Sequence, residues 1–297
     1  YTESGTGGNA TFTVTLSEAS AQEVTVNYAS SNNTATAGSD YTAASGTVTI
    51  AAGATSATFN VPVSADTLDE ASETATMTLS SPTNATISDA TGTLTIVDDD
   101  TAPTLSINDV SYTESGTGGN ATFTVTLSEV SGQDVTVDYA SSDVSTTAGS
   151  DYTAASGTVT ILAGNTTQTF NVPVLVDTLD EVNETSTLTL SNPTNATISD
   201  ATGTLTIVDD DATPSLSIND NAMTEDPSDL SFTVSLSAAS SKEITVNYAA
   251  ADITAIGAFG GGTDYRPVST TALTFAPGET SKTIDVRIWE DADVEST

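Results

Sequence analysis

The sequence predicts an all-β protein made of tandem immunoglobulin-like β-sandwiches, and three observations support this fold class. Many short segments alternate a polar residue, usually Thr, with an apolar one, which is the pattern of half-buried antiparallel strands. Long stretches are duplicated: residues 1–18 are identical to residues 112–129, so Tyr1 recurs as Tyr112 after 111 residues. Each period holds about seven alternating segments, as a seven-stranded sandwich requires. No stretch has the periodicity of a confident helix.

The strands of the first repeat follow one another in a regular order, separated by turns rich in Gly and Asn. We expect strands at 11–16, 23–28, 47–50, 58–63, 74–79 and 93–96, with 105–107 opening the second repeat. The apolar residues of these strands should face the core, namely Phe12, Val14, Leu16, Val26, Tyr28, Val48, Ile50, Phe59, Val61, Met77, Leu79, Leu94 and Ile96.

The period also predicts the domain boundaries, because residues 37–50 recur as 148–161 and residues 82–100 as 193–211. A diverged third copy begins near Met223. We expect domains at 1–101, 102–212 and 213–297, with the first strand of the first repeat partly missing and the third repeat truncated before its last strands. Pro103 and Pro214 stiffen the short connectors between them.

The charge of the chain excludes several classes of function. Its 297 residues contain 40 acidic and 4 basic side chains, which gives a formal net charge of −36. Such a polyanion is repelled by nucleic acid and by anionic membranes, and no apolar run is long enough to span a bilayer. The absence of His and Cys removes the usual general bases and nucleophiles, so we do not expect an enzyme.

The acidic side chains concentrate at four recurrent points of each repeat. The first repeat has Glu3, Asp40, a loop with Asp66, Glu70 and Glu73, and the terminal run Asp98, Asp99 and Asp100; the second has Glu114, Asp151, Asp177, Asp180, Glu181, Glu184, Asp209, Asp210 and Asp211; the third keeps Glu225, Asp264, Glu290, Asp291, Asp293 and Glu295. The turns of a sandwich gather at its two ends, so these acids can converge. Calcium binds about six to eight hard oxygen ligands and tolerates irregular geometry. The pattern therefore favours a calcium site over the alternative, a solvated acidic surface.

The order of these motifs resembles the Calx-beta domain, which occurs in sodium/calcium exchangers and in large extracellular proteins. The shared elements are Thr-Glu-x-Gly, Gly-Ser-Asp-Tyr, Asp-x-x-x-Glu-x-x-Glu and a final Thr-Ile-Val-Asp-Asp-Asp. The resemblance implies a seven-stranded sandwich that binds calcium at one pole. One departure affects the number of ions: exchanger domains often carry paired acids where this chain has Ala65 before Asp66 and Val176 before Asp177.

The resemblance also implies a ligand set, transferred position by position. In the first two repeats it comprises Glu3, Asp40, Asp66, Glu70, Asp98, Asp99, Asp100, Glu114, Asp151, Asp177, Glu181, Asp209, Asp210 and Asp211. The second glutamates of the loop, Glu73 and Glu184, would orient the loop more than coordinate. In the third repeat the candidates are Glu225, Asp264, Asp291 and Glu295. We expect this repeat, which ends before an aspartate run, to be the weakest calcium site.

These features predict a calcium-binding structural segment of a large bacterial extracellular or surface protein, a rod that calcium stiffens and that spaces an adhesive region. Its partners would be calcium ions and neighbouring repeats or like subunits. Two alternatives remain. The chain could be a subunit of an extracellular filament assembled by strand donation, as the incomplete first and third repeats would allow. It could also be a calcium sensor module, although near-identical repeats suit stiffness better than graded sensing.

Overall fold

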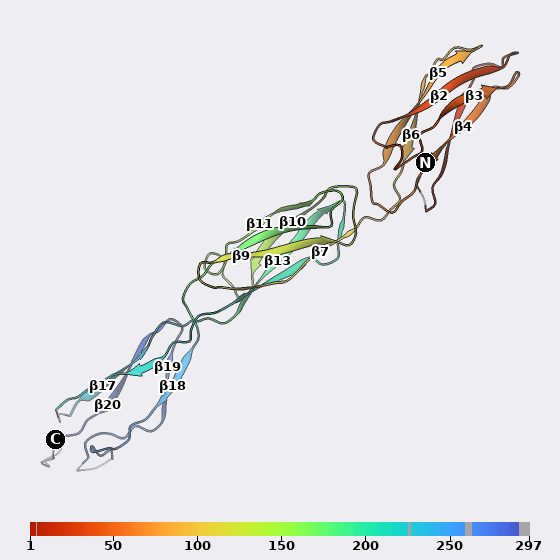
Figure 1. Ribbon diagram of the computed structural model, residues 1–297. Helices are drawn as coiled ribbons and strands as arrows, with labels where there is room; N and C mark the ends of the chain where they lie inside the picture. The colour runs from red at the N-terminus through yellow and green to blue at the C-terminus, as the bar shows by residue number, and fades with distance from the viewer. Residues whose placement is uncertain (4, 225–226, 259–262, 291–297) are drawn as a thin grey trace.

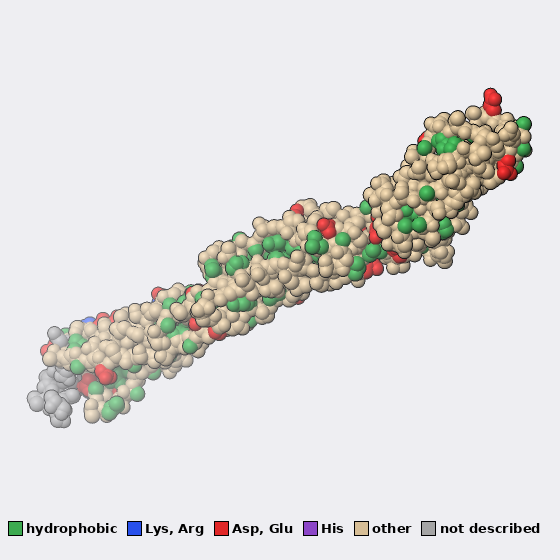
Figure 2. Space-filling model, turned by 45° about the horizontal axis from the view of Figure 1, so that its top comes forward, with side chains coloured by type: hydrophobic (Ala, Val, Ile, Leu, Met, Phe, Trp, Pro, Cys, Tyr) green, Lys and Arg blue, Asp and Glu red, His purple; other side chains and the backbone are tan. Residues whose placement is uncertain are grey.

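The computed structural model describes residues 1–3, 5–224, 227–258 and 263–290 and shows three β-sandwiches that follow one another end to end (Figure 1). The described residues form strands and turns, with no helix. None of them therefore forms a helix of the length and apolarity that crossing a bilayer requires. The all-β prediction is confirmed. Figure 2 shows a surface dominated by uncharged groups, with acidic side chains at the boundary between the first and second sandwich.

The first sandwich pairs a two-stranded sheet with a four-stranded one, in the orders β1-β4 and β3-β2-β5-β6. All of these pairings are antiparallel, as the strict alternation of polar and apolar residues requires. The strands are β1 (Gly8–Thr15), β2 (Val24–Asn32), β3 (Ser45–Ile50), β4 (Ser56–Val63), β5 (Glu73–Thr83) and β6 (Thr91–Ile96).

The second sandwich has the same plan with further short strands, in sheets ordered β11-β10-β13-β15-β8 and β12-β9-β7-β14. Its opening segment divides between the sheets, because β7 pairs with β9 and β8 pairs in parallel with β15. The strands are β7 (Thr104–Ile107), β8 (Val110–Thr113), β9 (Gly119–Leu127), β10 (Val135–Asp143), β11 (Ser156–Ile161), β12 (Thr167–Val174), β13 (Glu184–Thr194), β14 (Thr197–Ile198) and β15 (Thr202–Val208). The short strands β8 and β14 lie outside the predicted set.

The third sandwich is more open over the described residues, with sheets ordered β16-β17-β20 and β18-β19. Its strands are β16 (Leu216–Ile218), β17 (Asp229–Leu236), β18 (Ile244–Tyr248), β19 (Thr271–Phe275) and β20 (Ser281–Arg287). An apolar cavity of about 770 Å³ lies between the sheets, lined among others by Leu230, Phe232 and Tyr248.

The predicted inward residues do form the core of the first sandwich. Most of them are buried, including Val61 and Met77, whereas Phe12 and Val14 of β1 are only partly buried. Their counterparts in the second sandwich, Phe123 and Val125 of β9, are fully buried. The difference follows from β7, which lies beside β9 in the sheet and adds Leu105 and Ile107 to the core of the second sandwich.

Candidate metal-binding poles

One end of the first sandwich brings four remote segments together. The loop after β4 is held to the Asp-Tyr turn, since the Ser64 amide donates to the Asp40 carbonyl at 2.9 Å. The Glu3 amide donates to the Val97 carbonyl at 3.0 Å, which joins the start of the repeat to the end of β6. The Glu70 amide donates to Asp98 Oδ1 at 3.3 Å, which joins the loop to the terminal aspartates. These backbone contacts position all the acidic points of the repeat at one end.

We call this end the acidic pole of repeat one, defined by Glu3, Asp40, Asp66, Glu70, Glu73, Asp98 and Asp100. Its carboxylates form two groups. In one, oxygens of Glu3, Asp98 and Asp100 lie within 4.8 Å of one another. In the other, oxygens of Asp40, Glu70 and Glu73 satisfy the same limit. Glu73 thus belongs with the candidate ligands, whereas the family resemblance implied a role for it in orienting the loop.

Burial and, after it, the crowding of negative charge raise the pKa values of several carboxyl groups at this pole. The pKa of Glu3 rises to about 7 because burial disfavours its charged form and because Asp66 and Asp98 lie nearby. The pKa of Glu73 also rises to about 7, owing to burial and then to its hydrogen bond with Asp40. The pKa of Asp100 is raised by desolvation and by its aspartate neighbours, and its Oδ2 atom is buried without a hydrogen-bond partner.

The second sandwich repeats this construction. We call its acidic pole the pole of repeat two, defined by Glu114, Asp151, Asp177, Glu181, Glu184, Asp209 and Asp211. Oxygens of Asp151, Glu181 and Glu184 lie within 4.8 Å of one another. Burial and the nearby carboxylates raise the pKa of Glu114 to about 7, and burial together with a hydrogen bond to Asp151 does the same for the pKa of Glu184. Over the described residues, Glu114, Asp209 and Asp211 do not form a group as close as that of Glu3, Asp98 and Asp100.

The remaining predicted ligands differ in their placement. Asp66 and Asp177 accept hydrogen bonds from the amides two residues later, at 2.8 and 2.7 Å, and so shape their loops. Asp99 and Asp210 are exposed and lie outside the three close groups found among the described residues.

In the third sandwich, Asp264 occupies the position of Asp40 and Asp151. Its Oδ2 atom accepts a hydrogen bond from the Ile256 amide at 2.7 Å, and its buried Oδ1 atom has no partner. The other candidates of this repeat, Glu225, Asp291 and Glu295, lie outside the described residues.

Each pole also touches the next sandwich through a residue that the predicted ligand set does not contain. Between repeats one and two, Ser131 Oγ donates to Asp69 Oδ2 at 2.8 Å, and the Gly132 amide donates to the Asp69 carbonyl at 2.9 Å. Both side chains are buried, with 8% of Asp69 and 1% of Ser131 exposed. Gly132 packs closely against the loop here, because a Cβ atom would lie 2.8 Å from Glu70 Cγ and the Glu70 side chain would have to shift.

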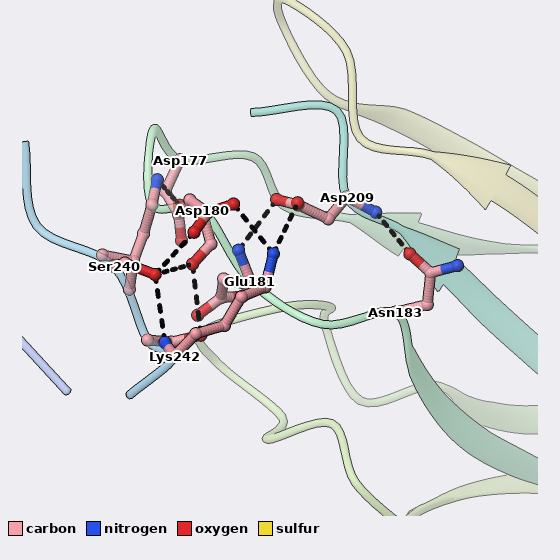
Figure 3. Close-up of polar contacts among 9 residues, drawn as sticks. Asp177, Asp180, Glu181, Asn183, Asp209, Ser240 and Lys242 are labelled. Atoms are coloured by element: carbon pink, nitrogen blue, oxygen red, sulfur yellow. Dashed lines mark hydrogen bonds and ion pairs between the residues drawn. The ribbon is translucent and has the colours of Figure 1, made fainter. Parts of the chain in front are cut away.

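The second junction is built in the same way from Asp180 and Ser240 (Figure 3). Ser240 Oγ donates to Asp180 Oδ2 at 2.6 Å, and Lys242 Nζ lies 2.8 Å from Asp180 Oδ1. The hydrogen bond from Lys242, followed by that from Ser240, lowers the pKa of Asp180. Sequence reasoning missed both junctions, although the recurrence of serine at 20, 131 and 240 in the turn before the second long strand was a visible signal.

The chemistry of the poles fits a hard divalent cation. All candidate ligands are carboxylate oxygens, which calcium prefers, and neither nitrogen nor sulfur ligands are present. The unpartnered Oδ2 atom of Asp100 and the raised carboxyl pKa values both indicate charge that a cation would balance. The two close groups at the pole of repeat one therefore offer carboxylate ligands at two separate candidate ion positions.

Comparison with known proteins gives one family. The sequence profile of the Calx-beta domain matches residues 1–100, 98–211 and 209–297. Among curated proteins, no significant match is found.

Several solved structures match the chain at low similarity. They include CBD12 from CALX1.2 (16% identity, 67% of this chain and 93% of that chain, TM-score 0.32) and the calcium binding domain CBD12 of CALX1.1 (17% identity, 68% and 93%, TM-score 0.32). The apo-form Calx CBD1 domain matches with 20% identity over 37% of this chain and 100% of that chain, at a TM-score of 0.33. This structural likeness is too low to carry an argument, so the family assignment rests on the profile.

Proposed function

The chain belongs to the Calx-beta domain family, and we propose that its repeats form a calcium-stiffened rod within a large extracellular or cell-surface protein. One observation carries this proposal. The loop of residues 66–70 contains candidate calcium ligands, Asp66 and Glu70, and also Asp69, which contacts the following repeat. An ion that orders this loop would therefore also order the junction.

In this mechanism each residue has a defined task. Glu70, Glu73 and Asp40 would hold one ion, and Glu3, Asp98 and Asp100 would hold another. Asp69 would transmit the ordering of the loop to Ser131 of the next repeat. Without calcium, mutual repulsion of the carboxylates would loosen the loop and let the junction bend. In this proposal the rod spaces an adhesive region and has no catalytic role.

The proposed units of the rod are residues 1–101, 102–212 and 213–297. Repetition of similar domains joined by short connectors suits a spacer, because each unit adds length with only nearest-neighbour contacts. Extracellular calcium modules bind the ion with dissociation constants of about 10⁻⁴ to 10⁻³ M. A calcium titration that gave submicromolar affinity would instead favour the alternative of a sensor module.

Distance measurement between two repeats tests the proposal. The chain contains no cysteine, so the exposed positions Thr13 and Thr169 can each be changed to Cys and spin-labelled specifically. We expect calcium to narrow the distribution of distances between the two labels. In the same double-cysteine background, Asp40→Asn should reduce this response. Asp89→Asn, at an exposed turn outside the pole, serves as the matched control. A distribution that calcium leaves unchanged would contradict the stiffened rod.

A filament subunit assembled by strand donation is the second candidate function. The apolar cavity of about 770 Å³ in the third sandwich favours it, since a donated strand could cover Leu230 and Phe232 there. Sedimentation over a range of protein concentrations distinguishes the two functions. Assembly that grows with concentration would support the filament, and a constant monomer would support the rod.

A further inference from the structure

We propose that the ammonium group of Lys242, which belongs to repeat three, takes the place of one calcium ion at the acidic pole of repeat two. This pole would then bind one ion fewer than the pole of repeat one. The inference rests on the proposed calcium function and identifies the residue that sets the number of ions at each pole.

Lys242 is directed at the pole from the turn between β17 and β18 (Figure 3). Its Nζ atom lies 2.8 Å from Asp180 Oδ1 and 3.7 Å from Asp209 Oδ2, and thus bridges the loop and the terminal aspartates of repeat two. The side chain of Asp180 is only 3% exposed and that of Asp209 only 11%. The Lys242 side chain itself is 33% exposed, so its ammonium group meets two carboxylates that are shielded from water while the lysine remains partly in contact with solvent.

The turn that carries Lys242 is fixed in position. The Lys242 amide donates to Ser240 Oγ at 3.1 Å, and the Ser241 amide donates to the Asp180 carbonyl at 2.9 Å. The Gly278 amide donates to the Ser240 carbonyl at 2.8 Å. Because the backbone is held at both Ser240 and Ser241, the lysine is delivered to the same place whenever repeats two and three are in contact.

The first junction has the same architecture with a neutral residue at this position. Gln133 follows Ser131 as Lys242 follows Ser240, and its amide donates to Ser131 Oγ at 3.0 Å. Its side-chain Nε2 donates to Asp69 Oδ2 at 3.5 Å. The glutamine thus reaches the junction aspartate but brings no positive charge to Asp98, the counterpart of Asp209.

The close carboxylate groups differ between the two poles in the way expected if Lys242 replaces an ion at the pole of repeat two. At the pole of repeat one, Asp98 groups with Glu3 and Asp100 within 4.8 Å. Within the described residues, the counterparts Glu114, Asp209 and Asp211 form no such group, and it is Asp209 that faces Lys242. The first 241 residues contain no Lys or Arg. Positive charge for the pole of repeat one must therefore come largely from ions in solution.

Reciprocal exchange of the two residues tests the inference. Bound calcium is counted by equilibrium dialysis and metal analysis at saturating ion concentration, and the midpoint of thermal unfolding is measured in chelator. We expect Lys242→Gln to gain one calcium ion per chain and to unfold at a lower temperature in chelator. Gln133→Lys should lose one ion per chain and unfold at a higher temperature in chelator. Lys242→Arg, which keeps the charge, should bind the wild-type number.

Lys282→Gln is the matched control for net charge, because Lys282 pairs with Glu279 within repeat three and should leave the ion count unchanged. If the wild-type chain binds calcium and both exchanges leave the count unaltered, Lys242 is only a junction ion pair and the inference is wrong, while the proposed function stands. If the wild-type chain binds no calcium, the proposed function itself fails. Circular dichroism verifies folding, and Gln133→Lys decides the question should Lys242→Gln not fold.

Discussion

Repeats two and three use the same alternating strands but differ in how completely they enclose a core. In repeat two, residues of both sheets form one buried cluster that includes Leu188 of β13 and Leu205 of β15. In repeat three, the buried cluster contains only Val234, Leu236, Phe275 and Ile284 among the described residues, and a cavity adjoins it. Alternation therefore determines which face of a strand points inward, whereas closure of the core depends on a full set of strands.

The largest effect that we expect from this difference concerns the core. Leu188→Ala removes a side chain that is 0% exposed, and should lower the free energy of unfolding by about 2–5 kcal/mol. Leu273→Ala, at a partly buried position of β19, should lower the free energy of unfolding by clearly less. Urea unfolding followed by circular dichroism and by fluorescence of the single Trp289, which lies in repeat three, measures both. Equal losses would show that repeat three is as tightly packed as repeat two.

Calcium should stabilise repeats one and two more than repeat three. At a calcium concentration of 100 times the dissociation constant, each site adds about 2.7 kcal/mol to the free energy of unfolding. In a thermal scan, chelator should lower the midpoint temperature of the main unfolding transition, which circular dichroism follows. The midpoint of the transition followed by Trp289 fluorescence should stay nearly unchanged. A Trp289 transition that responds as strongly as the main one would contradict the weak site expected in repeat three.

A smaller effect should follow from cutting the contact between the two repeats. Ser240→Ala removes a donor from the buried Asp180 carboxylate, at a cost of about 1–3 kcal/mol. The Trp289 transition should then occur at lower urea concentration. Ser20→Ala is the control. Ser20 accepts a hydrogen bond from the Gln22 amide at 3.0 Å within its own turn, just as Ser240 accepts one from the Lys242 amide. A comparable shift of the Trp289 transition in the control would mean that the junction bond contributes little.

The comparison also predicts a pH dependence of stability without calcium. The pKa values of Glu114 and Glu184 are raised to about 7 from the ordinary 4.5, so between these values the folded state holds more protons than the unfolded state. Stability is therefore fully present below about pH 4.5 and is lost as the pH rises through 7. We expect the main transition in chelator to occur at lower temperature at pH 8 than at pH 5.5. Saturating calcium should weaken or reverse this trend.

Much of the fold could be predicted because polar and apolar residues alternate with a period of two in the strands. The same reasoning located the acids that meet at each pole, since turns of a sandwich converge at its ends. The division of these acids into two groups depends on side-chain geometry, which spacing does not encode. The roles of Asp69 and Lys242 depend on contacts between repeats, and a single repeat considered alone gives no sign that a loop aspartate faces the next domain. The predicted domain boundaries and the full ligand set remain predictions.

The close approach of Gly132 to Glu70 has a consequence for how such a chain can evolve. Residues 1–18 and 112–129 are identical, yet the position of Gly132 is occupied by Ala21 in repeat one. A Cβ atom at this place would lie 2.8 Å from the side chain of Glu70, which groups with Asp40 and Glu73, so that this side chain would have to shift. A copy of repeat one inserted after itself would therefore place a methyl group against a candidate ligand, whereas the second junction accommodates Ser241 at the same position. The packing at the first junction thus distinguishes repeat two from repeat one as the unit that follows Glu70.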